Sequence, residues 1–567
     1  MRRDLADIIA DQVAETFRHE IVAVEFRKSP AGVPDAVLTL VNPLTRVPAA
    51  LASSDVVESV VLKSHEVKIR LRDRFLAEHA ARLAEPNGFA VEAQTSAPQR
   101  VRVAFCDPNL NKALHAGHLR NIALGTAIAG LWRWTGAAVS TQSVACDIGR
   151  NMAEALAGLN RAGWSDPDEV AGRLDRQLGE LYARYVTAAA VDETRGNAAD
   201  RMIARELDLH RDEADRILDR WRAQDPVVRS QWTKVVDRVL REHATTLARL
   251  GVTIDTVVLE SIALPGQPAL VEALVRTGLA QVEPSGAVVL ATGRPEYAHC
   301  PLVRADGFPT EHLRALVLWL ALAARPFDAT VHIMGDEWRI STEVRIAVLD
   351  RLLDTDFSSH YTTVNHALVR FGSSTMKSSS GNVLLIDEAL DAVFARARSI
   401  GAAGEAADDR GVRAALLLPM LAAAPDQIVD VTECTFSRLE DNLGWQLAAV
   451  ARQARTGPLP LPNPGSPVER FLVLQVERFN AIVRRAANAN DPRSLVRFCR
   501  HLLALEQRSS LTPTALLWRA RLIDHGLAAL GALDFDRRGL RERLTMVERA
   551  PGRRFDHGRF EIVVEAR

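Results

Sequence analysis

The chain has 567 residues, too many for one hydrophobic core, and this length predicts about three or four domains. Its 70 basic and 71 acidic residues leave a net charge of −1, so any nucleic-acid partner has to be bound by local patches. The five cysteines include no Cys-x-x-Cys pair, which favours reduced thiols over a disulfide framework or a zinc cage. The longest apolar runs are too short to span a bilayer, so we expect a cytoplasmic protein with no membrane contact.

The first 82 residues have the pattern of a small α/β domain. Residues 1–17 predict an amphipathic helix, and the acidic residues inside its apolar pattern are unlike a signal peptide. Short β-prone runs follow in DAVLTLV and VVESVVL, and the alternation of EVKIRLRDRFLAEHAARL then changes into a helical pattern. Residues 83–100, rich in Pro, Gly and small polar residues, predict a linker.

A parallel β–α–β unit is predicted to follow the linker. RVRVAF is a compact β-branched run, LRNIALGTAIAGLWRWTG predicts a helix that closes on Gly136, and AAVSTQSVACDIG predicts the next strand and its loop. The loop between the first strand and the helix is therefore expected at the carboxyl end of a parallel strand, where such sheets bind ligands.

The remaining chain alternates between helical and mixed character. Residues at about 151–255 predict a charge-rich helical insertion, which we expect to be solvated and to take no part in the catalytic layer. Mixed α/β character returns in AVVLATG, ATVHIMGDEW and FGSSTMKSSSGNVLLIDEAL, and from about residue 430 the pattern is almost wholly helical. We interpret the arginine-rich tail at 537–567 as a solvated helix, with RNA backbone contact as the alternative.

The loop that starts the β–α–β unit, CDPNLNKALHAGHLRN, contains two histidines three residues apart. Metal ligation by His115 and His118 is disfavoured, because neither a glutamate between them nor a third ligand is evident, and we expect no metal site there. Two surface histidines are the plain alternative. Their position on the first turn of a helix favours a phosphate site, because free N–H groups and a partial positive charge lie there.

The glycine and the basic side chains of this loop both point to a nucleotide. Gly117 has no side chain, so a ribose or a base can lie against its backbone. Two imidazoles and the ammonium of Lys112 are expected to neutralise the charge that develops on a triphosphate during displacement.

These residues resemble a known family. HAGH resembles the HIGH signature of class I aminoacyl-tRNA synthetases, and PNLNKALHAGHLRNIALGTAIAGLWRWTG is similar to the arginyl-tRNA synthetase pattern around that signature. Three more segments resemble arginyl enzymes in the family's order: residues 66–83, 257–292 and 376–397. One HxGH motif is weak, but four ordered segments are specific.

The resemblance implies a fold and a domain order. We expect an α/β Rossmann-type (HUP-like) catalytic domain with a parallel sheet, an N-terminal α/β domain and a C-terminal all-α bundle. The implied segments are an additional domain at 1–82, a linker at 83–100, the catalytic domain with its insertion at 101–390, connecting helices at 391–430, an anticodon-binding-like domain at 431–536 and the tail at 537–567.

The resemblance also implies an ATP site, with ATP as a substrate and Mg²⁺ bound to its triphosphate. Catalytic roles fall on Lys112, His115, His118 and Lys377, and the implied ATP-binding residues are Gly117, Asn109, Gly335, Met376, Gly381 and Asn382. The second signature departs from the usual KMSKS, since TMKSSSGN displaces Lys377. Lys112 stands where many arginyl enzymes carry a lysine ahead of HIGH, so the cation has moved. The alternative for TMKSSSGN is a flexible Ser/Gly loop.

The amino-acid pocket departs further from the family. Its implied residues are Asp107, Asn109, Asp147, Glu311, Ala315 and Trp338. In DGFPTEHLRAL, Asp306, Gly307 and Arg314 persist, but Glu311 replaces the family's Tyr and Ala315 its Asp. Trp338 replaces a Gln, and Asp107 replaces the usual Ser. A guanidinium favours a planar carboxylate partner, so either Glu311 supplies a relocated carboxylate or the pocket recognises a different cation. Trp338 as a core residue is the alternative.

The resemblance therefore implies a ligase that activates an amino acid with ATP and transfers it to the 3′ end of a tRNA. The amino acid is arginine or another one, the protein is a specialised paralogue, and it is a monomer or a homodimer. A tRNA-independent ligase that passes the adenylate to an amine acceptor is one alternative. A non-catalytic synthetase paralogue is the other.

Overall fold

The computed structural model describes residues 21–532 with internal gaps. The gaps are residues 28–33, 48–53, 86–88, 90–98, 165, 187–197, 295–299, 324–326, 355, 372–373, 376–383, 401–408, 432–437, 455–457 and 507–510. Within these described ranges, no helix is both long enough and apolar enough to cross a membrane.

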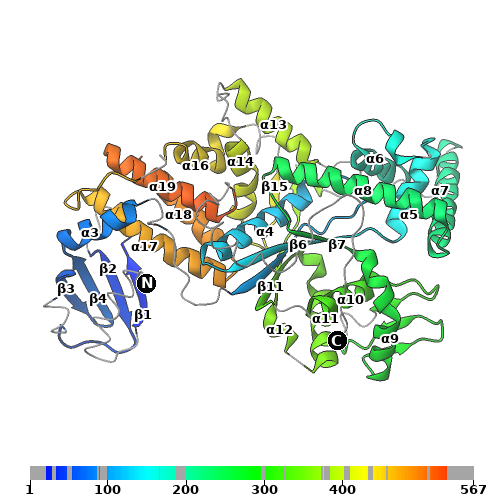
Figure 1. Ribbon diagram of the computed structural model, residues 1–567, viewed down its shortest axis with the longest axis horizontal. Helices are drawn as coiled ribbons and strands as arrows, with labels where there is room; N and C mark the ends of the chain where they lie inside the picture. The colour runs from blue at the N-terminus through cyan, green and yellow to red at the C-terminus, as the bar shows by residue number, and fades with distance from the viewer. Residues whose placement is uncertain are drawn as a thin grey trace.

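Five parallel strands form the central sheet, in the order β12–β11–β5–β6–β7 (Figure 1). Their bounds are Arg100–Ala104 (β5), Ala138–Ala145 (β6), Thr256–Leu259 (β7), Ala329–Gly335 (β11) and Tyr361–His366 (β12). Val101, Val103 and Ile333 are fully buried, as a parallel sheet covered on both faces requires. The loops after β5, β6 and β11 share one edge. The expected Rossmann-type parallel sheet is confirmed.

An antiparallel four-stranded sheet, ordered β1–β2–β4–β3, and helix α3 lie at one end of the molecule (Figure 1). The bounds are Ile21–Phe26 (β1), Ala36–Leu40 (β2), Val57–Lys63 (β3), Glu66–Leu71 (β4) and Asp73–Ala84 (α3). Every second residue of β2 and β4 is buried, Leu38 and Ile69 among them, so one face of the sheet is apolar. The predicted change from strand to helix is confirmed by β4 and α3. The helix expected at residues 1–17 lies outside the described residues.

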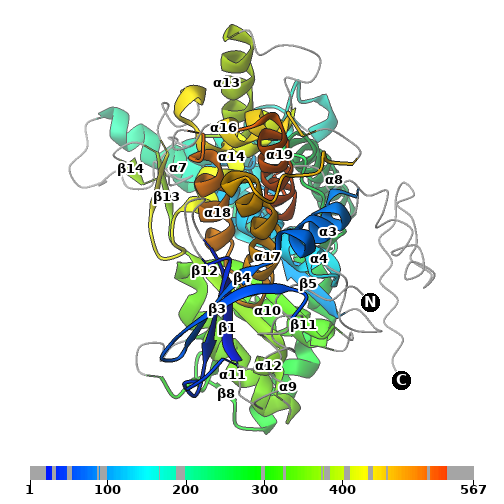
Figure 2. The same cartoon turned by 90° about the vertical axis from the view of Figure 1, so that its left-hand side faces the viewer.

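Helix α4 (Ala116–Trp134) joins β5 to β6 and lies between the sheet and the C-terminal helices (Figure 2). It is apolar almost all round, because it contacts protein on both sides. Close approach explains two of its glycines: an added Cβ would lie 2.2 Å from the Phe105 ring at Gly125 and 2.4 Å from the Ala529 carbonyl oxygen at Gly130. The helix ends at Trp134, and Gly136 follows with a φ of +88°.

Four helices form the insertion at the other end of the molecule (Figure 1). They are Arg150–Arg161 (α5), Leu174–Val186 (α6), Ala198–Arg222 (α7) and Pro226–Arg249 (α8). The insertion has a hydrophobic core of its own around Trp221 and Trp232, and Leu110 and Phe308 from outside it join that core. The expectation of a solvated insertion separate from the catalytic layer is therefore wrong, because its helices pack on the loop after β5.

A smaller unit packs beside β7. A three-stranded antiparallel sheet, ordered β10–β9–β8, lies near helices α9 to α11. The bounds are Gln267–Arg276 (α9), Ala280–Val282 (β8), Val288–Leu290 (β9), Pro301–Val303 (β10), Glu311–Ala323 (α10) and Arg339–Leu353 (α11). Leu302, Leu316 and Trp319 belong to one buried cluster, which packs α10 against β10 and α11.

The C-terminal region is helical, as expected. Its helices are Ile386–Ser399 (α13), Asp409–Ala422 (α14), Leu443–Ala451 (α16), Pro467–Asn488 (α17), Arg493–Leu503 (α18) and Pro513–Ala529 (α19). A short three-stranded sheet precedes and interrupts them, formed by Val369–Phe371 (β13), Ser374–Thr375 (β14) and Val429–Val431 (β15). Buried Arg120 of α4 donates to the carbonyl oxygens of Ala367, Ala424 and Gln427 and so joins this region to the sheet. The arginine-rich tail lies outside the described residues.

Candidate active site

The two histidines of the opening motif cap helix α4 reciprocally. His115 is the N-cap residue, and its Nδ1 accepts a hydrogen bond from the Gly117 N–H at 3.1 Å. His118 Nδ1 in turn accepts from the His115 N–H at 3.2 Å, and the two ring centroids are 4.1 Å apart. Two orphan donors of the helix terminus are thereby satisfied by imidazoles, in the pattern of a capping box.

This geometry fixes the protonation of both rings. A backbone N–H donates only to a ring nitrogen that carries no proton, so each Nδ1 presents a lone pair and each proton lies on Nε2. Burial, and then the Lys112 charge, lowers the pKa of His115 to about 3. Burial and the neighbouring groups hold the pKa of His118 well below its usual value. In the ligand-free protein each imidazole therefore offers an N–H donor at Nε2, and the expected role of the two rings beside a triphosphate stays a prediction.

Gly117 has a structural role in this cap. A Cβ at this position would lie 2.8 Å from Cε1 and 2.9 Å from Nδ1 of His115. Only glycine leaves room for the imidazole to reach back to the helix terminus. Burial also lowers the pKa of Lys112, which lies one turn before His115.

The far end of the second-signature segment joins the same helix terminus. His115 and Leu385 form an antiparallel bridge, the Ala116 N–H donates to the Leu384 carbonyl at 2.9 Å, and the Ile386 N–H donates to the Leu114 carbonyl at 3.1 Å. Residues 384–386, which follow the second signature in the sequence, therefore pair with the first signature. Met376, Lys377, Gly381 and Asn382 lie outside the described residues, so their assigned roles stay predictions.

Asp107 and Asn109 lie at the carboxyl end of β5, on the edge where a substrate is expected. Asp107 Oδ1 accepts from the Val144 N–H at 2.7 Å, and its Oδ2 lies 2.6 Å from His332 Nε2. His332 Nδ1 lies 2.5 Å from the Tyr361 hydroxyl. Because a carboxylate only accepts, His332 donates from Nε2 and Tyr361 can donate to Nδ1. Asn109 forms a parallel bridge with Cys146. Sequence reasoning missed His332 and Tyr361, which hold the Asp107 carboxylate in place.

Asp147 and Arg314 have partners within the protein. Asp147 Oδ1 accepts from the Ser261 N–H at 2.8 Å, and burial raises the pKa of this carboxyl. Its backbone carbonyl accepts from Trp232 of the insertion at 2.7 Å. Arg314 forms an ion pair with Glu260 at 3.0 Å, and both side chains are largely buried. These contacts fix the β6 loop and helix α10, so Asp147 lies near the predicted pocket as a structural anchor.

The other predicted pocket residues lie on α10 and just after β11. Glu311 is exposed at the start of α10, whereas Ala315 packs half-buried against the cluster around Trp319. Trp338 is 38% exposed, so the alternative that it is a core residue is wrong. Gly335 ends β11, and a Cβ there would lie 2.3 Å from the Glu337 carboxylate.

A buried arginine lies among these pocket residues. The Arg345 guanidinium lies 4.9 Å from the ring centroid of Trp319 and 6.0 Å from that of Trp338. It also donates to Thr342 Oγ1 at 3.0 Å. A positive charge therefore lies beside the position where the family's glutamine is replaced by Trp338. No local pattern in the sequence marked Arg345.

Comparison with known proteins shows which family the chain resembles. Residues 82–310 match the catalytic domain of the class I (R) tRNA synthetases. Residues 82–310 are therefore similar to the catalytic domain of a class of ligases. Within that class the chain is arginyl-tRNA synthetase-like, as the sequence resemblance predicted.

Curated relatives and solved structures agree with this class. An arginine–tRNA ligase of Bacteroides fragilis is 26% identical over 315 residues, which is 54% of this chain and 52% of that protein. One from Treponema pallidum is 27% identical over 312 residues, 53% of this chain and 49% of that protein. The chain thus aligns with about half the length of these relatives. The Thermus thermophilus arginyl-tRNA synthetase structure has a TM-score of 0.69 at 19% identity, covering 93% of this chain and 99% of that chain. The Plasmodium falciparum enzyme has a TM-score of 0.62 at 12% identity, covering 93% and 96%.

Proposed function

We propose that the protein activates an amino acid with ATP as the aminoacyl adenylate and transfers it to the 3′ end of a tRNA. The observation that carries this proposal is the reciprocal cap of His115 and His118 at the carboxyl edge of the central sheet, joined there to Leu384 and Leu385 of the second-signature segment. A helical C-terminal region in the same fold as full-length arginyl enzymes supports the tRNA as acceptor.

The chemistry requires positioning and electrostatic stabilisation only. The amino-acid carboxylate attacks the α-phosphorus of ATP, the bond from that phosphorus to the bridging oxygen breaks, and pyrophosphate leaves. The Nε2–H groups of His115 and His118 and the ammonium of Lys112 are proposed to stabilise the charge that moves onto the leaving group. Mg²⁺ arrives with the triphosphate as part of the substrate.

We further propose that the amino acid differs from arginine. Ala315 offers no carboxylate for a guanidinium, and Arg345 places a like charge within 6.0 Å of Trp338. Repulsion between two guanidinium groups in a partly buried site opposes arginine binding. Asp107, held by His332 and the Val144 N–H, presents a carboxylate suited to the α-ammonium group that every amino acid shares.

Pyrophosphate exchange on a panel of the twenty amino acids, with and without bulk tRNA, tests the proposal. Exchange with one amino acid together with its transfer to tRNA supports the synthetase. Exchange without transfer to any tRNA favours the ligase that passes the adenylate to an amine acceptor. No exchange with any amino acid overturns the proposal and favours a non-catalytic paralogue.

A further inference from the structure

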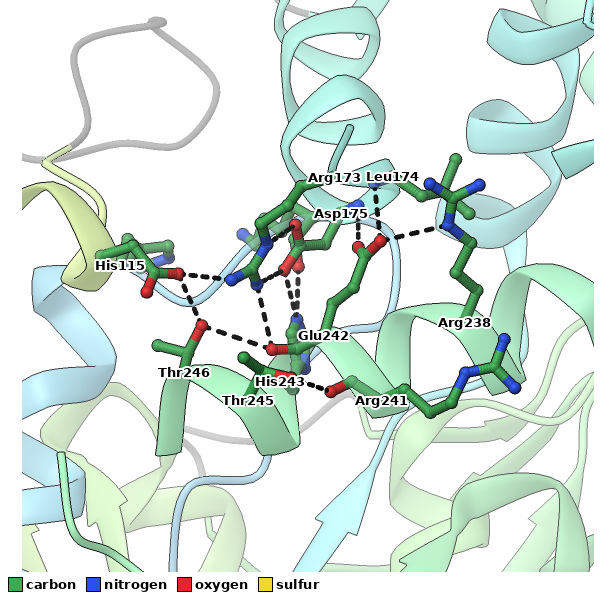
Figure 3. A network of polar contacts seen from close by, with 12 residues as sticks. His115, Arg173, Leu174, Asp175, Arg238, Arg241, Glu242, His243, Thr245 and Thr246 are labelled. Carbon is green, nitrogen blue, oxygen red and sulfur yellow. Dashed lines mark hydrogen bonds and ion pairs between the residues drawn. The ribbon is translucent and has the colours of Figure 1, made fainter. Parts of the chain in front are cut away.

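A network of polar contacts that includes Arg173, Glu242, His243 and Thr246 of the insertion lies beside His115 (Figure 3). The insertion holds the first turn of α13 through one carboxylate, that of Asp387. Asp387 Oδ2 accepts from Arg173 Nη1 at 2.7 Å and from Thr246 Oγ1 at 2.6 Å. Its Oδ1 accepts from Arg249 Nη1. All three donors come from the insertion, Arg173 just before α6 and the other two from α8. Asp387 therefore fastens α13 to two segments that precede it in the chain by more than a hundred residues.

The same face of α8 also holds the loop in front of the histidines. His243 Nε2 donates to the Lys112 carbonyl oxygen at 2.9 Å. His243 and Thr246 are three residues apart, so they lie on one face of the helix. Glu242, beside them, caps the start of α6 by accepting from the N–H groups of Leu174 and Asp175 at 2.9 Å and 2.7 Å. One rigid helix thus contacts both segments that flank His115.

The spacing of these contacts couples them to the histidine cap. Asp387 lies two residues after Leu385, the residue that pairs with His115. A shift of the first turn of α13 would therefore move the Leu384 carbonyl that accepts from the Ala116 N–H. Side chains of Asp387, Arg173 and Arg249 are 21%, 30% and 33% exposed, so their attraction is only partly screened by solvent.

We propose that Asp387 is a positioning residue that holds the second-signature segment in register with the histidine cap, using α8 as the brace. The expected change in the KM for ATP rests on the proposed function, whereas the expected change in amide exchange does not. Asp387 and the contacts of α8 set the separation of the two walls of the ATP site, and the amino-acid pocket beyond β5 and β11 lies outside their reach.

Asp387→Asn tests this, because it keeps the shape of the side chain and removes the charge that two arginines share. Asp391→Asn is the matched control: it removes an equal charge one turn along α13, where the exposed carboxylate contacts only Arg249 among the described residues. Thr246→Val is a second variant, which removes one donor without changing any charge.

Amide hydrogen exchange reports on how firmly α8 holds the first turn of α13, and it requires no catalytic activity. Asp387→Asn should speed exchange of the Ala116 and Ile386 amides by about tenfold, Thr246→Val by less, and Asp391→Asn by under about twofold. In pyrophosphate exchange, Asp387→Asn should raise the KM for ATP by about tenfold and leave the KM for the amino acid within about twofold.

The two measurements separate failure of the brace from failure of the function. Unchanged amide exchange in Asp387→Asn overturns the positioning role. Equal rises in both KM values overturn it as well, since they indicate a general loss of structure. Faster amide exchange in a protein that activates no amino acid leaves the brace standing and overturns the proposed function.

Discussion

His115 and His118 each use Nδ1 to accept a bond from the backbone, and this leaves Nε2–H as the group that each ring can offer to a nucleotide. Neutral donors of this kind stabilise developing charge without first taking up a proton. A histidine whose pKa is lowered in the folded protein also makes folding stability depend on pH. Its contribution to stability is present above the unfolded pKa of about 6.5 and is lost as pH falls toward the folded value.

The pH dependence of activity should reflect these neutral rings. Because the pKa of His115 is lowered to about 3, we expect no acid limb near pH 6.5 in kcat/KM for ATP between pH 5 and 8. Initial rates of pyrophosphate exchange across that range check this. A fall of about tenfold per pH unit below pH 6.5 would show that a ring titrates at its ordinary pKa.

Removing one imidazole should impair the chemistry more than the fold. His118→Ala is expected to lower the exchange rate by about a hundredfold, because one preorganised donor is lost. His65→Ala is the control, since His65 is an exposed histidine of the N-terminal sheet. Steady-state exchange with both variants is the measurement, and equal rates for His118→Ala and the parent protein contradict the assigned role.

Restoring the residues that the family carries at these pocket positions should allow the protein to activate arginine. Glu311→Tyr combined with Ala315→Asp returns a carboxylate, and Arg345→Leu added to them removes the opposing charge. Arginine-dependent exchange is expected to rise in the double variant and to rise further in the triple variant. If neither variant uses arginine better than the parent protein, these positions do not line the pocket.

At the residue scale the sequence predicted that His115 and His118 lie at the start of a helix, but it predicted neither their reciprocal cap nor the residues that support the pocket. The HAGH spacing and its position after a strand were local signals, available without a structure. His332 contacts Asp107 across 225 residues, Tyr361 contacts His332 in turn, and nothing in their neighbourhoods marks either residue. The same is true of Asp387, whose partners lie in a segment interpreted as solvated.

Among the elements, those with a local period were predicted well. The β5–α4–β6 unit follows from a β-branched run, an apolar helix and a second strand, and the structure confirms it. The insertion was predicted as helical from its charge-rich periodicity. Its contact with the active site was missed, because long-range ion pairs such as Arg173–Asp387 leave no periodic signal.

At Gly125 of helix α4, close packing and the intrinsic helix propensity of alanine have opposite effects on stability. Alanine is favoured over glycine inside a helix by about 1 kcal/mol, but Gly125→Ala would place a Cβ against Phe105 of the loop after β5. Overpacking costs about 1–3 kcal/mol, so we expect a lower Tm. Gly179→Ala on α6 is the control, because its Cβ would meet only Lys112 Cβ at an ordinary 3.5 Å. Calorimetry should show the opposite sign for the two variants, and a higher Tm for Gly125→Ala would contradict the close packing.

Over the whole molecule, buried charge ties the N-terminal sheet to the C-terminal helices. Arg470 of α17 donates from Nε to Asp35 at 3.0 Å, and the two side chains are 2% and 1% exposed. His79 Nε2 of α3 lies 2.8 Å from Glu477 Oε1, which also belongs to α17. Sequence patterns gave no indication of this connection, because its two contacts join residues 435 and 398 positions apart.

Breaking this connection should destabilise the protein. Asp35→Asn leaves Arg470 buried without its full countercharge, which costs about 3–5 kcal/mol for such pairs. Glu58→Gln removes an exposed pair with Arg70 and should change stability by under about 1 kcal/mol. Thermal unfolding and limited proteolysis between the two regions compare the variants, and equal Tm values would show that the buried pair adds little.

The contact between α4 and α19 has an evolutionary consequence. Gly130 faces the Ala529 carbonyl, and Gly531, with a φ of +66°, faces the side chain and carbonyl of Thr126, so the two segments approach closely at both glycines. An insertion or a larger side chain on only one of these two segments would disrupt the contact. A larger residue at Gly130 or Gly531 is therefore accommodated only if the facing segment shifts as well, so the two segments are expected to change together.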